Sequence, residues 1–255
     1  MEDKIREMAS DLEGNIGLYY KDLSTGKSIS INENEPFLAA SVIKIAVLIE
    51  AFKQNNLGKL CFEELIVVSN EDKLPSCGSL TYMHDGIEVT VRDLCVLMII
   101  QSDNTATNIM IKKLGKENIN KTVKDLGLEK THLNRLLFDS EEQKKGKENY
   151  ISPREMGILL EMMWKGELVS KEASHEMLEI LKMQQINHKI PYFIPKGIKI
   201  AHKTGEDSGI TNDVALVLAD KPFILCVAAN NTNVQQTEDF YRKAGKYFYD
   251  ISQND

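Results

Sequence analysis

The sequence predicts an α+β fold in which one antiparallel sheet takes strands from both ends of the chain. Two short β patterns open the chain at 16–21 and 28–32, on either side of the turn Leu23–Gly26. Helical spacing then dominates until Pro195, after which strand patterns return and a last helix follows. Because the two groups of strands can share a sheet only if the block between them is an insertion, this order favours a sheet with an inserted helical unit.

The domain boundaries follow from that order. We expect a discontinuous sheet domain of residues 1–39 and 196–255, and an inserted helical domain of residues 40–195. At about 150 residues per domain, the 255 residues fit one large domain or two small ones. Roughly three quarters of the surface of the unfolded chain would be buried on folding, which is enough for a substantial core.

The individual elements follow from hydrophobic periodicity. Residues 1–13 are expected to form a charged amphipathic helix. From Ser41 to Phe52, apolar residues at helical spacing predict the most apolar helix of the chain, which ends near Gly58. Further helices are expected at 90–101, 105–114, 117–126, 153–164, 171–182 and 234–252. The C-terminal strands are expected at 198–203, 213–219 and 223–229.

Composition and charge exclude several classes of protein. Hydrophobic residues make up 42% and charged residues 27% of the chain, as in ordinary globular proteins. The net charge of -7 argues against binding to the backbone of a nucleic acid. The longest uninterrupted apolar run, Leu94–Ile100, is too short to cross a bilayer, so we expect no membrane span.

The cysteines and histidines indicate neither a metal site nor a cofactor. The four cysteines form no C-x-x-C pair and the five histidines form no H-E-x-x-H motif, so we expect free thiols, no zinc and no disulfide framework. No basic-then-apolar leader follows Met1, which fits a cytoplasmic protein or a secreted one whose leader has been removed.

Ser41 and Lys44 form an S-x-x-K motif at the start of the apolar helix. Residues three apart lie on one helix face, close enough for proton exchange, and a helix N-terminus offers N–H groups to a developing oxyanion. Burial disfavours the ammonium form of Lys44, so its amine can act as a base. The motif alone is weak, because it arises by chance roughly once or twice in such a chain. Ser24–Lys27 is a second match, in a turn.

Two rarer triplets complete the pattern. The S-D-N triplet Ser102–Asn104 lies between helical segments, where the simplest alternative is a polar helix cap. The K-T-G triplet Lys203–Gly205 ends a strand pattern, where the alternative is an edge strand with a glycine bulge. Each triplet is expected by chance only about 0.06 times at this composition, so the joint order S-x-x-K, S-D-N, K-T-G indicates a function.

With this trio the sequence resembles the class A serine β-lactamase family over nearly its whole length. Thr90–Leu94, Thr105–Asn108 and Ser152–Met156 look like further helix signatures of that family. The resemblance implies a β-lactamase-like fold: a five-stranded antiparallel sheet with flanking helices and an inserted all-helical domain, with the catalytic cleft between them.

The resemblance also implies a role for each matched residue. Ser41 is the expected nucleophile, Lys44 its activating base, and Ser102 the relay that passes a proton to the leaving nitrogen. The backbone N–H groups of Ser41 and Glu206 would form the oxyanion hole, and Asp103 is expected to be a buried structural cap. Substrate binding falls to Asn104, Lys203, Thr204 and Gly205.

One departure from the family pattern bears on turnover. Leu137 stands where the family has the glutamate that activates the deacylating water, two residues after Arg135. Carboxylates in a different register could replace it, unless they are only surface groups on a solvated loop. These carboxylates are Asp139, Glu141 and Glu142.

Two smaller departures concern binding and stability. Asn212 stands where many members have an arginine for the substrate carboxylate, and Leu48 stands where some members have the disulfide partner of Cys95. The loop Pro75–Leu80 is expected at the mouth of the cleft, with Cys77 exposed. Together the departures favour intact acylation machinery and doubtful deacylation machinery.

The leading interpretation is therefore a serine β-lactamase-type hydrolase that opens β-lactam amides through an acyl-Ser41 intermediate, with slow deacylation. Two alternatives stay open: a D,D-peptidase-like or esterase-like enzyme, and a sensor or sink that binds β-lactams or cell-wall peptides covalently with negligible turnover. A non-catalytic interaction protein is disfavoured because the catalytic residues occur together. The expected partner is a small β-lactam or a cell-wall peptide, and the resemblance favours a monomer.

Overall fold

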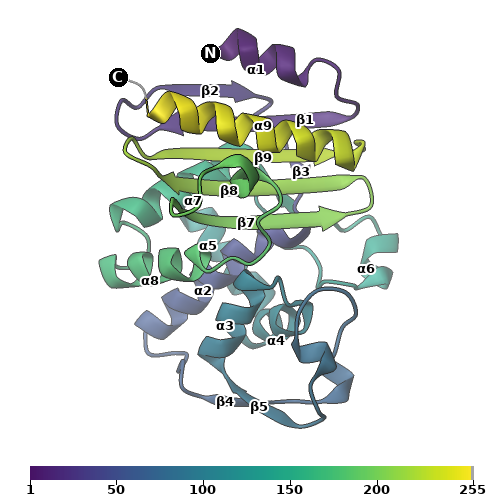
Figure 1. The fold of residues 1–255 in the computed structure, drawn as a ribbon. Coiled ribbons are helices and arrows are strands. Elements are labelled where there is room, and N and C mark those ends of the chain that lie inside the picture. The colour runs from purple at the N-terminus through teal and green to yellow at the C-terminus, as the bar shows by residue number, and fades with distance from the viewer. Residues whose placement is uncertain (254–255) are drawn as a thin grey trace.

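The computed structural model describes residues 1–253 and is built around a five-stranded antiparallel sheet (Figure 1). The strands lie in the order β2-β1-β9-β8-β7. Their bounds are Asn15–Asp22 (β1), Ser28–Ile31 (β2), Lys199–Asp207 (β7), Ile210–Leu218 (β8) and Phe223–Asn230 (β9). The first two strands and the last three share one sheet, which confirms the predicted α+β class.

The two ends of the chain meet where β1 pairs with β9. Their register runs from Asn15 opposite Asn230 to Asp22 opposite Phe223, over the whole length of β1. On the other side of β9 the sheet continues through β8 to β7, which is an edge strand. The K-T-G triplet therefore lies on the edge of the sheet.

Most of the helices lie close to their predicted positions. They are α1 (Glu2–Ala9), α2 (Lys44–Asn56), α3 (Val91–Ile100), α4 (Asn104–Leu114), α5 (Lys116–Asp125), α6 (Ser140–Lys144), α7 (Pro153–Lys165), α8 (Lys171–Lys182) and α9 (Val234–Ser252). Capping residues fix several starts: Thr90 begins α3 with a capping box, and the hydroxyl of Ser152 accepts a hydrogen bond at the start of α7. The short α6 was not predicted.

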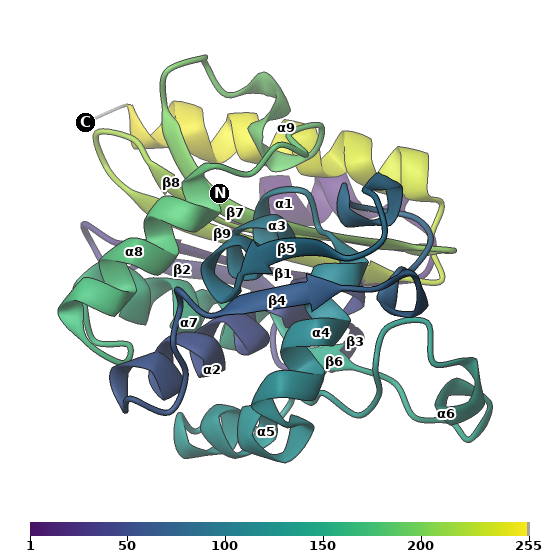
Figure 2. The ribbon, with the colours of Figure 1, turned by 90° about the horizontal axis from the view of Figure 1, so that it is seen from below.

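Helices cover both faces of the sheet (Figures 1 and 2). α9 lies across one face with α1 beside it, and α7 packs against the other. Successive residues of a strand point to opposite faces, so Leu225 and Val227 of β9 pack with α9. Ile224 and Cys226 pack instead into the larger cluster, which also contains α2, α3 and α8.

Several short elements escaped the sequence prediction. β3 (Phe37–Leu38) pairs with β6 (Tyr150–Ile151), and β4 (Leu65–Val68) pairs with β5 (Ile87–Thr90). Within residues 1–253 there are also four 3-10 turns: η1 (Ala40–Ile43), η2 (Asn70–Asp72), η3 (Leu80–Tyr82) and η4 (Ile190–Phe193). Strands of two to four residues contain too few alternations to be found unless a tight turn marks them, as Leu23–Gly26 marks β2.

Several predicted boundaries were wrong. The first helix, expected over 1–13, ends at Ala9. The helix expected from Ser41 begins as the 3-10 turn η1, and α2 starts only at Lys44. β7 does not end at the K-T-G triplet but continues to Asp207, and β8 begins at Ile210. A two-residue turn with Gly209 at φ +68° closes this hairpin. The residues next to the turn therefore stay paired, although they show no apolar alternation.

The cysteines are free thiols, as expected: Cys95 and Cys226 are buried, and Cys61 and Cys77 are exposed. Within residues 1–253, no helix combines the length and the hydrophobicity that crossing a membrane requires.

Candidate active site

A cavity of about 770 Å³ lies where η1, the segment before α4, the 135–149 segment and the end of β7 meet. Its walls include Ser41, Asn104 and Glu206, three residues that the sequence analysis assigned to the site. Ser76 and Cys77 also line it, which places the loop before η3 at its mouth as expected.

Lys44 lies at the centre of a hydrogen-bond network behind this cavity. Its side chain is fully buried, and its Nζ lies 3.0 Å from the Oγ of Ser102, 2.7 Å from the carbonyl oxygen of Ser102 and 2.9 Å from Oδ1 of Asn104. None of the hydrogen bonds of the described residues joins Lys44 to Ser41, so in this state the amine contacts the S-D-N triplet rather than the serine one turn before it.

The hydroxyl of Ser102 connects two buried lysines. Lys203 is fully buried, and its Nζ lies 3.0 Å from the same Oγ that Lys44 contacts. The Nζ of Lys203 also donates to the carbonyl oxygen of Thr204 at 2.8 Å. A hydroxyl between two amines can accept a proton from one side and donate one to the other, so this geometry is suited to proton relay.

Burial shifts the pKa of both lysines downward. Desolvation, followed by the charge of Lys203, holds the pKa of Lys44 well below its usual value. Desolvation, followed by the charge of Lys189, lowers the pKa of Lys203 to about 7. A lowered pKa increases the fraction of free base, which is the form that can take a proton from a hydroxyl.

The backbone around Ser102 is held in an uncommon conformation by Asp103. Ser102 has φ +57°, in the left-handed region that non-glycine residues rarely adopt. Oδ1 of the buried Asp103 accepts from the N–H of Ala106 and so caps α4, while Oδ2 accepts from the N–H of Leu80. Both bonds are 2.9 Å long, so Asp103 ties η3 and α4 together, as expected for a structural cap.

η1 packs directly against the K-T-G strand. A Cβ on Gly205 would lie 2.9 Å from the carbonyl oxygen of Ala39 and 3.2 Å from the backbone nitrogen of Ser41. Only glycine allows this approach of β7 to the turn that carries Ser41. It brings the backbones of Ser41 and Gly205, the residue before Glu206, close together beside the cavity.

Leu137 lines the cavity together with Ser41. Asn108 of α4 fixes its backbone from both sides: Oδ1 accepts from the N–H of Leu137 and Nδ2 donates to its carbonyl oxygen, each at 2.9 Å. The next residue, Phe138, has φ +60° and a half-exposed side chain. An apolar side chain thus occupies the part of the wall where the resemblance placed a glutamate.

The carboxylates considered as replacements for that glutamate have other partners. Asp139 caps α6 by accepting from the N–H of Glu142, Glu141 pairs with Lys144, and none of the three lines the cavity. Glu142 pairs with Lys145 and Lys147, whose hydrogen bonds lower its pKa to about 2.

Within the 135–149 segment, the carboxylate that lines the cavity is Glu148, which the sequence analysis did not single out. Its Oε2 accepts from Nε (3.0 Å) and Nη2 (2.7 Å) of Arg135, and its Oε1 accepts from Gln143 at 2.9 Å. Both oxygens are therefore engaged within the loop. Nothing in the local sequence distinguishes Glu148 from the other charges of the run that begins at Lys144.

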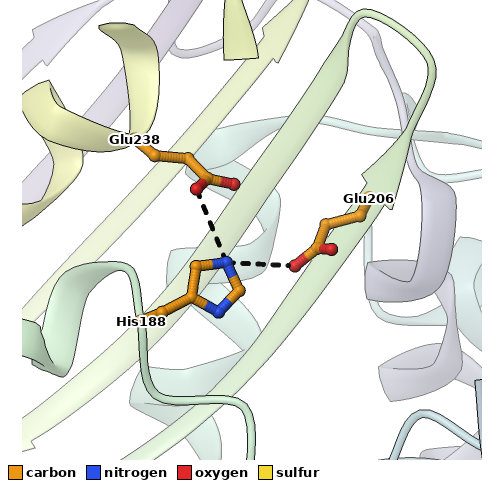
Figure 3. A group of neighbouring side chains, drawn as sticks. All are labelled: His188, Glu206 and Glu238. Carbon is orange, nitrogen blue, oxygen red and sulfur yellow. Dashed lines mark ion pairs between the residues drawn. The ribbon is translucent and has the colours of Figure 1, made fainter. Parts of the chain in front are cut away.

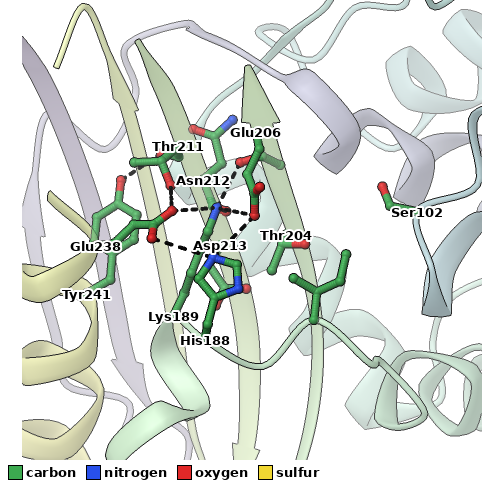
Figure 4. Close-up of polar contacts among 12 residues, drawn as sticks. Ser102, His188, Lys189, Thr204, Glu206, Thr211, Asn212, Asp213, Glu238 and Tyr241 are labelled. Carbon is green, nitrogen blue, oxygen red and sulfur yellow. Dashed lines mark hydrogen bonds and ion pairs between the residues drawn. The ribbon is translucent and has the colours of Figure 1, made fainter. Parts of the chain in front are cut away.

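A second group of charged side chains lies beside the K-T-G strand (Figure 4). The fully buried ammonium of Lys189 donates to the carbonyl oxygens of Gly205 (3.1 Å) and Asn212 (3.3 Å). The same Nζ lies 3.2 Å from Oε1 of Glu206 and 3.5 Å from Oε1 of Glu238. Sequence reasoning missed Lys189, because a lysine in an irregular segment carries no periodic signal of burial.

The structure thus brings most of the assigned residues together. Lys44, Ser102, Asn104 and Lys203 share one hydrogen-bond network, while Ser41 and Glu206 share the cavity. Thr204 is buried beside Lys203 in β7, and Gly205 packs against η1. The rival serine Ser24 lies in the turn after β1, away from this network, where its N–H donates to Asp22.

Comparison with known proteins agrees with this geometry. A family model described as the β-lactamase enzyme family matches residues 1–252. β-Lactamase 3 of Bacillus cereus is 26% identical over 231 residues, which covers 88% of this chain and 72% of that protein.

Solved structures show the same fold. The crystal structure of a β-lactamase from Sphaerobacter thermophilus DSM 20745 has a TM-score of 0.90 at 26% identity and covers 98% of this chain and 96% of that chain. The structure of PBP-A has a TM-score of 0.89 at 27% identity, with 99% and 95% covered. A leucine-to-glutamate variant of PBP-A, solved as an acyl-enzyme complex with penicillin G, matches equally well. The chain therefore belongs to the β-lactamase enzyme family, as a serine hydrolase of the class A type.

Proposed function

We propose that the protein opens the amide bond of β-lactams through an acyl-Ser41 intermediate and releases the product slowly. The observation that supports this most directly is the network in which Lys44 and Lys203 both contact the hydroxyl of Ser102, behind the cavity that Ser41 lines. It supplies a free amine, a proton relay and a nucleophile within one site.

Acylation would proceed by two proton transfers. The free amine of Lys44 takes the proton of Ser41, and the Ser41 oxygen attacks the lactam carbonyl carbon. Two backbone N–H groups, those of Ser41 and Glu206, would stabilise the oxyanion. As the carbon–nitrogen bond breaks, Ser102 donates its proton to the leaving nitrogen and regains one from the Lys44 ammonium, so that the lysine ends as the free base again.

Substrate binding would use the edge of the sheet. Lys203 and Thr204 would bind the substrate carboxylate, and Gly205 allows the ligand to approach the strand. Asn104 lines the cavity and uses its Oδ1 for Lys44, so its amide nitrogen is the group directed to a substrate side chain.

Since every one of these groups comes from a single chain, we propose that the protein acts as a monomer.

Slow deacylation would follow from Leu137. The deacylating water needs a base within hydrogen-bond reach, and an apolar side chain occupies that part of the wall. A leucine-to-glutamate variant of PBP-A has been solved as an acyl-enzyme complex with penicillin G, which supports acyl-enzyme formation on this fold. A D,D-peptidase-like activity or a covalent sink would share the acylation step and differ in turnover.

Intact-mass measurement after mixing with benzylpenicillin tests the proposal. We expect one adduct per chain, which maps to Ser41 and decays slowly. Ser41→Ala should abolish it, and Ser24→Ala, which removes the serine of the second S-x-x-K match, should label like the wild type. Absence of an adduct in the wild type, or an adduct on Ser24 or Ser102, would defeat the assignment. An adduct that never decays would favour the sink.

A further inference from the structure

Three side chains from separate segments meet beside the end of β7 (Figure 3). His188 precedes η4, Glu206 lies near the end of β7, and Glu238 lies near the start of α9. In Figure 3 the ring of His188 points between the two carboxylates. Its Nε2 lies 3.4 Å from Oε1 of Glu206 and 3.5 Å from Oε2 of Glu238. Neither the proposed acylation nor the proposed substrate binding uses these three side chains.

We propose that this cluster binds one divalent transition-metal cation of the zinc type through His188 Nε2, Glu206 Oε1 and Glu238 Oε2. In a tetrahedral zinc site with bonds of about 2.0–2.1 Å, neighbouring ligand atoms lie about 3.3–3.4 Å apart. Both distances from Nε2 already have nearly this length, and all three atoms lie within 4.8 Å of one another. Glu206 is half exposed, so its side chain can move to close the third edge.

The donor set agrees with that class of cation. One imidazole and two carboxylates suit zinc and its neighbours, whereas magnesium and calcium prefer oxygen ligands only. Three protein ligands leave a fourth position for water, and the exposed edges of His188 and Glu206 open this position to solvent.

Neighbouring groups hold the ligands in place before any ion binds. The Oε1 of Glu238 accepts from the hydroxyl of Thr211 at 3.1 Å, and the carbonyl oxygen of His188 accepts from Nε of Arg242 at 2.7 Å. Such outer contacts orient metal ligands and raise affinity.

Two cations next to the cluster limit the affinity. Lys189 and Arg242 both contact Glu238, and their charges oppose a second positive charge nearby. Lys189 has other partners, the carbonyl oxygens of Gly205 and Asn212, and can stay in place when Glu206 turns toward an ion. We therefore expect reversible binding of moderate affinity rather than a permanently loaded structural zinc.

The site escaped sequence analysis because its ligands lie far apart in the chain. No two of the residues 188, 206 and 238 have the spacing of a known zinc motif, and only the fold brings them together.

An ion there would join the segment before η4, the end of β7 and the start of α9, and so would fix the strand whose Glu206 N–H is the proposed oxyanion donor.

The proposal is tested by titrating zinc into the chelator-treated full chain and measuring the binding by calorimetry. We expect one equivalent to bind, and His188→Ala to weaken binding by at least about 100-fold, more than the loss of an outer-shell partner. Glu238→Gln should weaken it as well, with an unchanged circular dichroism spectrum. His175→Ala is the matched control: His175 is an exposed helical histidine that pairs with a neighbour one turn away, Glu179, and its loss should leave binding unchanged.

Several results would overturn the site. These are no saturable binding in the wild type, unchanged binding in His188→Ala, an equal loss in His175→Ala, or magnesium binding as tight as zinc binding. The readout is metal binding and not reaction with a β-lactam. A failure of this proposal therefore leaves the acylation proposal intact, and the reverse also holds.

Discussion

Lys44 is the residue on which acylation chemistry depends most. It contacts Ser102 and Asn104, and its pKa is held well below the usual value, first by burial. We predict that Lys44→Ala slows acylation by several orders of magnitude, comparable to loss of Ser41, because residues that act as a unit are not additive. Stopped-flow labelling with a chromogenic β-lactam measures this rate. Acylation at a rate near that of the wild type would make Lys44 a structural residue.

Lys203 gives the reaction a predicted pH dependence. Its pKa of about 7 means that the ammonium form, which would bind the substrate carboxylate, predominates below pH 7 and is lost as the pH rises through that value. The second-order rate of acylation, which reports on the free enzyme, should therefore fall on the alkaline side of about pH 7.

Lys203→Arg provides the control for this profile. An arginine keeps its charge at any pH the protein survives, so the alkaline decline should disappear in this variant even if its absolute rate is lower. A profile that still declines near pH 7 would assign the titration to another group.

The loop between α5 and α6 is the element that would determine turnover. Asn108 fixes the backbone of Leu137 through both its N–H and its carbonyl oxygen, so a side chain at 137 is held against the cavity. We predict that the wild type shows a burst of one equivalent followed by slow turnover, and that Leu137→Glu accelerates the slow phase. A positioned general base typically contributes about 10²–10⁴-fold.

Leu137→Gln tests whether the effect of Leu137→Glu comes from the charge of the new side chain or from its shape. Glutamine fills the same volume without a basic carboxylate, so its slow phase should stay near that of the wild type. Rapid turnover without a burst in the wild type would show that another base reaches the acyl bond, and Glu148→Gln would then test the cavity-lining carboxylate of the 135–149 segment.

Elements long enough to show several periods of the hydrophobic pattern were predictable from the sequence, and shorter elements were not. Periodicity located α3, α4, α5, α7, α8 and α9, and three motifs located the residues around Ser102. Periodicity did not locate β3 to β6, which are too short to show a period. It also did not show that β7 continues past the K-T-G triplet. Lys189, Glu148 and the His188 cluster were unpredictable for another reason: their neighbours come from distant segments, and nothing local marks them.

The molecule as a whole depends on the core between α9 and the sheet. Phe248 of α9 is fully buried and stacks on Tyr20 of β1, with ring centroids 3.9 Å apart. We predict that Phe248→Ala lowers the free energy of unfolding by about 3–5 kcal/mol through lost burial and the cavity it leaves. Urea titration should show a lower midpoint at an unchanged slope.

Tyr82→Ala is the control for that loss. Tyr82 is 81% exposed, so its removal should change the free energy of unfolding by no more than about 0.5 kcal/mol. Equal effects of the two substitutions would mean that the packing of α9 on the sheet contributes little to global stability.

The pairing of β1 with β9 sets the order in which the protein can form during synthesis. β1 leaves the ribosome well before its partner β9, because the helical block lies between them in the chain. Until β9 emerges, β1 has only β2 beside it, and an isolated two-stranded hairpin is marginally stable in water. Helices α2 to α8 can begin to assemble in the meantime, because many of their contacts join segments close in sequence, whereas the sheet must wait for β9. During that interval the chain exposes an unpaired strand edge, which makes closure of β1 on β9 the step most open to aggregation and to assistance by chaperones.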